Sequence, residues 1–120
     1  MTPLRRIAII GNSLPRRCGI ATFTTDLQQA LDQSPRVGGA SIIAMTDRVQ
    51  EYDYPASVAL SIADEDPLAY DAAARFLNAG PFDVVSLQHE FGIFGGPDGS
   101  HILRLVEHLR APLVTTLHTI

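Results

Sequence analysis

Apolar residues along this chain follow two alternating patterns, one typical of strands and one typical of helices. Unbroken or alternating apolar runs, each five or six residues at most, predict β-strands at residues 7–10, 41–46, 58–62, 83–88 and 113–117. Between them lie segments whose apolar residues recur every three or four positions, which predicts helices beginning at Gly19, at Pro67 and near Ile102.

Proline, glycine and one aspartate mark where the helices begin and end. Pro35 disfavours helical backbone at Ser34 and should end the first helix. Asp66 followed by Pro67 predicts an N-cap and a first helical residue, and Gly80 is expected to close that helix as a C-terminal glycine.

Strands that alternate with helices predict an α/β fold, here a Rossmann-like, mostly parallel sheet with flanking helices. The length of 120 residues and the hydrophobic content of 46% suit one domain spanning residues 1–120. The last apolar strand is followed by no segment that could cover it. A small domain with an edge strand is one interpretation, and an incomplete domain is the one we favour.

Composition narrows the classes of partner. A net charge of −4 argues against general nucleic-acid binding, and no apolar run reaches the length of a membrane span. The single cysteine, Cys18, has no internal disulfide partner, and the N-terminus does not resemble a signal peptide, so we expect a cytoplasmic protein. Arg5, Arg6, Arg16 and Arg17 form either a local anion site or a solvated end of the molecule.

Ligands of open α/β sheets bind at the carboxyl ends of the strands, where three loops of this chain should meet. The first, residues 11–19, leads into a helix whose free N–H groups suit a phosphate, and Gly19 would permit close approach. It is neither a P-loop nor a dinucleotide fingerprint, and a turn that only starts a helix is equally compatible with it.

The second loop, residues 88–96, combines polar and aromatic side chains. Gln88, His89 and Glu90 end a strand, and Phe91 and Gly92 follow, which suits recognition of a ligand rich in hydroxyl groups. The alternative is a strand end capped by its own polar side chains, with Phe91 and Phe94 in the core.

The third loop, residues 117–120, places His118 at the mouth of the sheet, in either a functional or a structural role. Other candidates have simpler interpretations. Asp64-Glu65-Asp66 resembles an Asp-x-Asp metal motif, but Asp66 is needed as a helix cap. His101 and His108 are too far apart along a helix to share a metal, and no base is evident beside Cys18.

Taken together, three segments resemble the N-terminal domain of family 4 (group 1) GT-B glycosyltransferases, and most closely a bacterial subgroup with a Gln-His-Glu-Phe-Gly motif. They are residues 15–23 (Pro-Arg-Arg-Cys-Gly-Ile-Ala-Thr-Phe), 84–96 (Val-Val-Ser-Leu-Gln-His-Glu-Phe-Gly-Ile-Phe-Gly-Gly) and 114–119 (Val-Thr-Thr-Leu-His-Thr). The resemblance extends from about Ile7 to the end of the chain.

The resemblance implies a metal-independent enzyme that transfers a hexose from a UDP- or GDP-sugar to an acceptor with retention of configuration. It implies that His118 contacts the donor sugar and that the loop carrying Arg17, Cys18 and Gly19 lies near the donor phosphates. The strand-end residues Gln88, His89, Glu90, Phe91 and Gly92 would line the acceptor cleft.

The same resemblance implies that the chain is inactive by itself, since the family's donor-binding domain with its Glu-x7-Glu motif is absent from these 120 residues. A non-catalytic Rossmann-like module that binds a sugar or a phosphate is the alternative. In either case Leu113, Val114 and Leu117 should form an exposed apolar flank through which the chain self-associates.

Overall fold

The computed structural model describes residues 5–47 and 52–118, which form alternating strands and helices. Every predicted strand and helix is present, with ends that differ from the prediction by a few residues. In chain order the elements are β1 (Arg5–Gly11), α1 (Gly19–Asp32), β2 (Val37–Thr46), β3 (Val58–Ala63), α2 (Pro67–Ala79), β4 (Val84–His89), the short 3-10 helix η1 (Pro97–Gly99), α3 (Ile102–His108) and β5 (Leu113–Leu117).

The five strands form one parallel sheet in the order β3-β2-β1-β4-β5. The chain builds outward from β1 in one direction through β2 and β3, and then in the other through β4 and β5. The strand order therefore reverses between β1 and β4, which creates a topological switch point at their carboxyl ends. The predicted α/β, Rossmann-like fold is confirmed.

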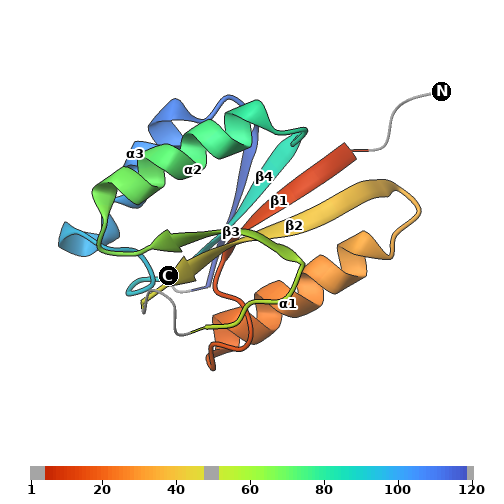
Figure 1. Ribbon diagram of the computed structural model, residues 1–120, viewed down its shortest axis with the longest axis horizontal. Coiled ribbons are helices and arrows are strands. Elements are labelled where there is room, and N and C mark those ends of the chain that lie inside the picture. Colours follow the sequence, from red (N-terminus) through yellow and green to blue (C-terminus); the bar gives the residue numbers. More distant parts are fainter. Residues whose placement is uncertain (1–4, 48–51, 119–120) are drawn as a thin grey trace.

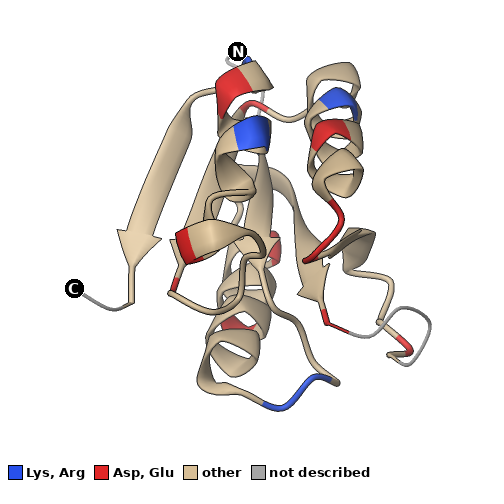
Figure 2. Cartoon of the chain, turned by 90° about the vertical axis from the view of Figure 1, so that its left-hand side faces the viewer, with Lys and Arg blue, Asp and Glu red and all other residues tan. Residues whose placement is uncertain are grey.

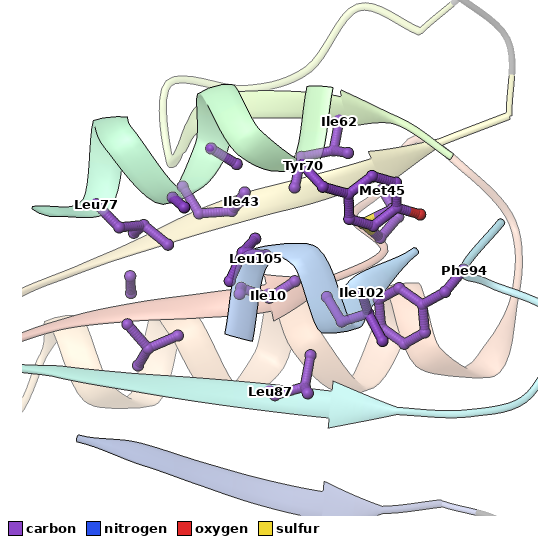
Figure 3. Packing of buried hydrophobic residues seen from close by; sticks show 14 of the residues in the cluster. Ile10, Ile43, Met45, Ile62, Tyr70, Leu77, Leu87, Phe94, Ile102 and Leu105 are labelled. Carbon is purple, nitrogen blue, oxygen red and sulfur yellow. The ribbon is translucent and has the colours of Figure 1, made fainter. Parts of the chain in front are cut away.

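Helices cover the two faces of the sheet unequally. Figure 1 shows α2 and α3 together on one face and α1 alone on the other. The main core lies under α2 and α3, where Ile10, Ile43 and Leu87 from the sheet meet Leu77 and Leu105 from the helices (Figure 3). On the opposite face α1 packs mostly on β2 and β1.

The ends of α2 show which local predictions were correct. The Asp66 carboxylate accepts a hydrogen bond from the backbone N–H of Leu68 at 3.1 Å, and Pro67 is the first helical residue, as predicted. Gly80 ends the helix, but its backbone is extended (φ −87°) and not left-handed. A Cβ atom at Gly80 would lie 2.8 Å from the Phe82 ring, so a larger residue would force this ring to move.

The edge strand β5 is exposed along most of its length. Val114 is 57% exposed and Leu117 is 64% exposed, whereas Leu113 is half-buried against the core. Figure 2 shows that this strand, which leads to the C-terminus, carries no acidic or basic residue. The sheet therefore presents an uncharged, largely apolar edge.

Candidate functional site

The carboxyl ends of β1, β4 and β5 lie side by side, which brings together the three loops that the sequence singled out. Ile10 of β1 pairs with Leu87 of β4, so Gly11 lies next to Gln88. On the far side of β4, His89 pairs with Leu117, and His118 follows directly. Residues 119–120 of the third loop, like residues 1–4, lie outside the described residues.

Gln88 and His118 are in direct contact at the carboxyl ends of β4 and β5. The Gln88 side-chain oxygen Oε1 lies 2.8 Å from Nε2 of the His118 ring. The backbone of His118 is also fixed, because its N–H donates to the His89 carbonyl oxygen at 2.9 Å. The buried Gln88 amide thus holds the His118 ring, and the His89 carbonyl holds its backbone.

An aromatic side chain from α1 completes this cluster. The Phe23 ring meets the His118 ring edge to face, with 4.8 Å between the ring centroids. Phe23 is itself largely exposed, so the pair forms a half-open aromatic surface beside the first helix. We call Phe23, Gln88 and His118 the switch-point cluster.

Close packing of α1 against β1 positions the first helix relative to the switch-point cluster. A Cβ atom at Gly11 would lie 2.7 Å from the Thr24 hydroxyl and 3.4 Å from Gln88 Cβ, so only glycine fits between them. The Thr24 hydroxyl is fully buried and has no hydrogen-bond partner among the described residues. Helix α1 is therefore packed closely against the carboxyl end of β1, next to Gln88.

The loop between β1 and α1 is tied down by Arg16. Its guanidinium donates to Asn12 Oδ1 at 3.3 Å and to the Met45 carbonyl at 3.2 Å, and forms an ion pair with Asp47 at 3.7 Å. Arg16 thus bridges the carboxyl ends of β1 and β2, and these contacts occupy it within the fold.

The four N-terminal arginines do not form a single cluster. Arg5 and Arg6 lie at the start of β1, where Arg5 pairs with Asp83 at 3.9 Å, and Arg16 and Arg17 follow the other end of that strand. An anion site built from all four is therefore wrong. Arg17 is exposed just before α1 and has no side-chain partner among the described residues.

Cys18 and Gly19 form the N-terminus of α1. The Cys18 sulfur caps the helix, accepting from the Ala21 N–H at 3.4 Å and from Asn12 Nδ2 at 3.3 Å. Nothing lies within 4 Å of the Cβ position at Gly19, so the space in front of the helix is open. The cysteine has a structural role as a cap, and Gly19 leaves the approach to the helix N-terminus free.

His89 points to the opposite face of the sheet from Gln88, because neighbouring strand residues alternate between faces. Its ring stacks on Phe94 with 5.5 Å between centroids and meets Phe91 edge to face at 5.4 Å. Its Nδ1 atom is buried and lacks a hydrogen-bond partner among the described residues. The side chains of Gln88 and His89, both predicted to line the acceptor cleft, therefore lie on opposite faces of the sheet.

The two phenylalanines of the second loop have different environments. Phe94 is 5% exposed and belongs to the core, as the structural alternative predicted, whereas Phe91 is 63% exposed. Glu90 is half-buried, and Gly92 has a left-handed backbone (φ +92°) that favours glycine at this turn. Only Phe91 of this aromatic pair is available to a ligand.

The glycine-rich part of this loop is anchored to the end of β3. The Tyr70 hydroxyl donates to the Asp64 carbonyl at 2.8 Å and accepts from the Gly95 N–H at 3.0 Å. Burial raises the pKa of Tyr70 to about 12, so the hydroxyl keeps its hydrogen. This loop is thus fixed at Gly95.

The side chains beside this anchor are acidic. Burial, followed by the nearby Glu65 carboxylate, raises the pKa of Asp64 above its ordinary value. Asp66 serves as the helix cap, and within residues 5–47 and 52–118 no three His, Cys, Asp or Glu side chains gather closely enough to bind a metal ion.

Sequence reasoning missed several residues at this edge: Asn12, Phe23, Thr24, Ser86 and Tyr70. Phe23 ends the first of the three motif segments, but the sequence gives no sign of its contact with His118. Strand alternation could have identified Ser86, since it shares a face with Gln88. Tyr70 lies one helical turn after Asp66, but its contact with Gly95 spans 25 residues and depends on the tertiary fold.

Comparisons with known proteins add no relative: no family model, curated protein or solved structure matches this sequence. Among the helices that the structure describes, none has the length and apolar character needed to cross a bilayer.

Proposed function

We propose that this chain is the acceptor-side, N-terminal part of a retaining glycosyltransferase that moves a hexose from a UDP- or GDP-sugar to an acceptor. The observation that carries the proposal is the direct contact of His118 with Gln88 and Phe23 at the switch point. These residues come from the three segments on which the glycosyltransferase resemblance rests. Their convergence at the ligand-binding edge of the sheet is what a shared function predicts.

In this proposal His118 contacts the donor sugar and the open N-terminus of α1 faces the donor phosphates. The helix dipole and unpaired N–H groups favour an anion there, and Gly19 leaves room for it. Exposed Arg17 supplies a positive charge beside the same helix end, and Cys18 shapes that end as its cap.

The acceptor side consists of Gln88, His89, Glu90, Phe91 and Gly92. Because Gln88 and His89 face opposite sides of the sheet, the acceptor would contact the loop after β4 chiefly through Glu90, exposed Phe91 and Gly92. The acceptor's identity would then depend on this loop and its neighbours.

Transfer requires a second, donor-binding domain, because the 120 residues contain no Glu-x7-Glu pair. Stabilisation of the leaving diphosphate needs charged groups that such a domain would supply. No metal is needed in this scheme. The single cysteine is the basis for placing the protein in the cytoplasm.

The test is a donor-turnover assay on the protein translated from the whole reading frame, with UDP- and GDP-hexoses as donors and released nucleotide as the readout. We expect His118→Ala to lower kcat/KM at least about tenfold, the cost of one hydrogen bond to the reacting ligand. Gly19→Val should raise KM for the donor, because the new side chain fills the open space before α1.

Gln29→Ala is the matched control, since Gln29 is exposed on α1 away from the strand ends and should leave turnover unchanged. If the protein binds a sugar or phosphate but turns over no donor, the non-catalytic binding module replaces the enzyme. If His118→Ala behaves like Gln29→Ala, the proposed site is wrong.

A further inference from the structure

A chain of polar side chains runs along β4 to His118 on the sheet face that carries α1. Ser86 and Gln88 share this face because they are two residues apart on one strand. Gln88 Nε2 donates to Ser86 Oγ at 2.8 Å, and Gln88 Oε1 lies 2.8 Å from His118 Nε2. Gln88 is only 1% exposed, so water does not compete for its amide group.

The orientation of the Gln88 amide decides which nitrogen of His118 carries the hydrogen. Its oxygen faces His118 and can only accept a hydrogen bond, so His118 Nε2 is the donor in this arrangement. In the neutral ring the other nitrogen, Nδ1, then has a free lone pair. Nδ1 has no hydrogen-bond partner among the described residues and is not among their buried unpaired atoms, so solvent or a ligand can reach it.

We propose that Ser86 and Gln88 are positioning residues that hold His118 in the Nε2–H tautomer, so that Nδ1 accepts a hydrogen bond from a ligand hydroxyl. A neutral His118 in this state recognises a hydroxyl donor and offers no N–H to a phosphate oxygen. That the hydroxyl belongs to the transferred sugar rests on the proposed function, whereas the tautomer does not.

Helix α3 provides an internal reference for this assignment. His108 Nδ1 lies 2.8 Å from the Arg104 carbonyl oxygen, which can only accept, so the hydrogen of neutral His108 is on Nδ1. The two histidines should therefore hold opposite tautomers in the same molecule.

The tautomers can be measured by long-range ¹H–¹⁵N correlation of the ring nitrogens in the ¹⁵N-labelled chain at about pH 8.5, where free imidazole is neutral. Signals are assigned by their loss in His118→Ala and His108→Ala. We expect a protonated Nε2 and an unprotonated Nδ1 for His118, and the reverse for His108. A protonated Nδ1 in His118, or an equal mixture of tautomers, overturns the proposal without any bearing on enzyme activity.

Two variants separate positioning from packing. Gln88→Leu should shift the His118 Nδ1 resonance toward the value of a tautomer mixture, and Ser86→Ala should shift it in the same direction by less. If Gln88→Leu fails to fold, Ser86→Ala alone tests whether the polar chain positions His118. The control variant Gln29→Leu, on the surface of α1, should not shift the resonance. An unmoved His118 spectrum in the folded Ser86 and Gln88 variants overturns their assigned role.

The hydroxyl contact is tested on the protein from the whole reading frame. A bound UDP-glucose or GDP-mannose should move the His118 Nδ1 resonance, while UDP and GDP alone should not. An equal shift with the bare nucleotides would show that His118 meets the phosphates, and sugar-nucleotide binding without any shift would remove His118 from the ligand. Either result contradicts the inference and leaves the turnover assay to decide the proposed function separately.

Discussion

Tyr70 joins the loop after β4 to the end of β3. Its hydroxyl uses both its donor and its acceptor capacity on backbone groups of Asp64 and Gly95. Tyr70 is fully buried, so loss of the hydroxyl would leave two backbone groups without a partner in a site that water reaches poorly.

We therefore predict that Tyr70→Phe lowers the free energy of unfolding by about 1–3 kcal/mol, measured by urea denaturation at neutral pH. Tyr52→Phe is the matched control, because the Tyr52 hydroxyl bonds to Asp47 in an exposed position and its loss should cost much less. Equal stability of the two variants would show that the Tyr70 anchor is unimportant.

The raised pKa of Tyr70 should make the free energy of unfolding depend on pH in the alkaline range. Its pKa is raised from the ordinary 10.0 to about 12 in the folded protein, so between these values the native state holds more protons than the unfolded state. Stability should fall as the pH rises through this window. Tyr70→Phe should weaken that dependence, and an identical alkaline slope in wild type and variant would contradict the assignment.

Asp64 is expected to act in the opposite direction from a typical paired carboxylate. Burial and Glu65 raise its pKa in the folded state, so ionisation disfavours the fold, and this penalty is fully present only above the folded pKa. We predict that Asp64→Asn raises the thermal midpoint at pH 7 and that the gain shrinks as the pH falls through the folded pKa. A lower midpoint at pH 7 would show that the carboxylate stabilises the fold.

At the level of whole elements, Gly95 and Gly19 are glycines for different reasons. A Cβ atom at Gly95 would collide with the Asp64 carbonyl group, whereas nothing lies near that position at Gly19. The first glycine therefore permits the loop after β4 to pack against β3, and the second leaves the N-terminus of α1 open.

Gly95→Ala should destabilise the protein by about 1–3 kcal/mol, the usual cost of forcing extra volume into a packed site. Gly19→Ala should leave stability unchanged or raise it by up to about 1 kcal/mol, since it restricts the unfolded chain without a clash. Thermal and urea unfolding of both variants test this pair, and a larger loss in Gly19→Ala would refute it.

The elements themselves were predictable because each is encoded locally, by apolar spacing and by caps such as Asp66 and Pro67. The motif that groups Gln88 with His89 does not show that strand alternation directs their side chains to opposite faces of the sheet. Local patterns do not encode the tertiary contacts that bury Phe94, leave Phe91 exposed and extend the Gly80 backbone.

At the scale of the whole molecule, the open edge of β5 is the feature with the clearest consequence. Among the described residues β5 pairs only with β4, and the strand offers unpaired backbone groups without a charged residue to discourage pairing. Val114 and Leu117 are exposed on it, from opposite faces of the strand.

We predict that the chain self-associates through this edge in a concentration-dependent way, measured by light scattering after size exclusion. Leu117→Lys should shift the population toward monomer, because a charge would then oppose edge-to-edge pairing, whereas Leu103→Lys on exposed α3 should not. A monodisperse monomer at all concentrations would contradict the prediction.

We propose that the carboxyl ends of β1, β4 and β5 form the donor-contacting edge of a retaining hexosyltransferase. The most direct test follows the anomeric signals of the sugar by ¹H NMR while the protein from the whole reading frame acts on a panel of UDP- and GDP-hexoses. We predict that wild type releases or transfers the sugar with its original anomeric configuration and that His118→Ala greatly slows this reaction. Three results would contradict this proposal: inversion of configuration, turnover that His118→Ala leaves intact, or no turnover with any donor.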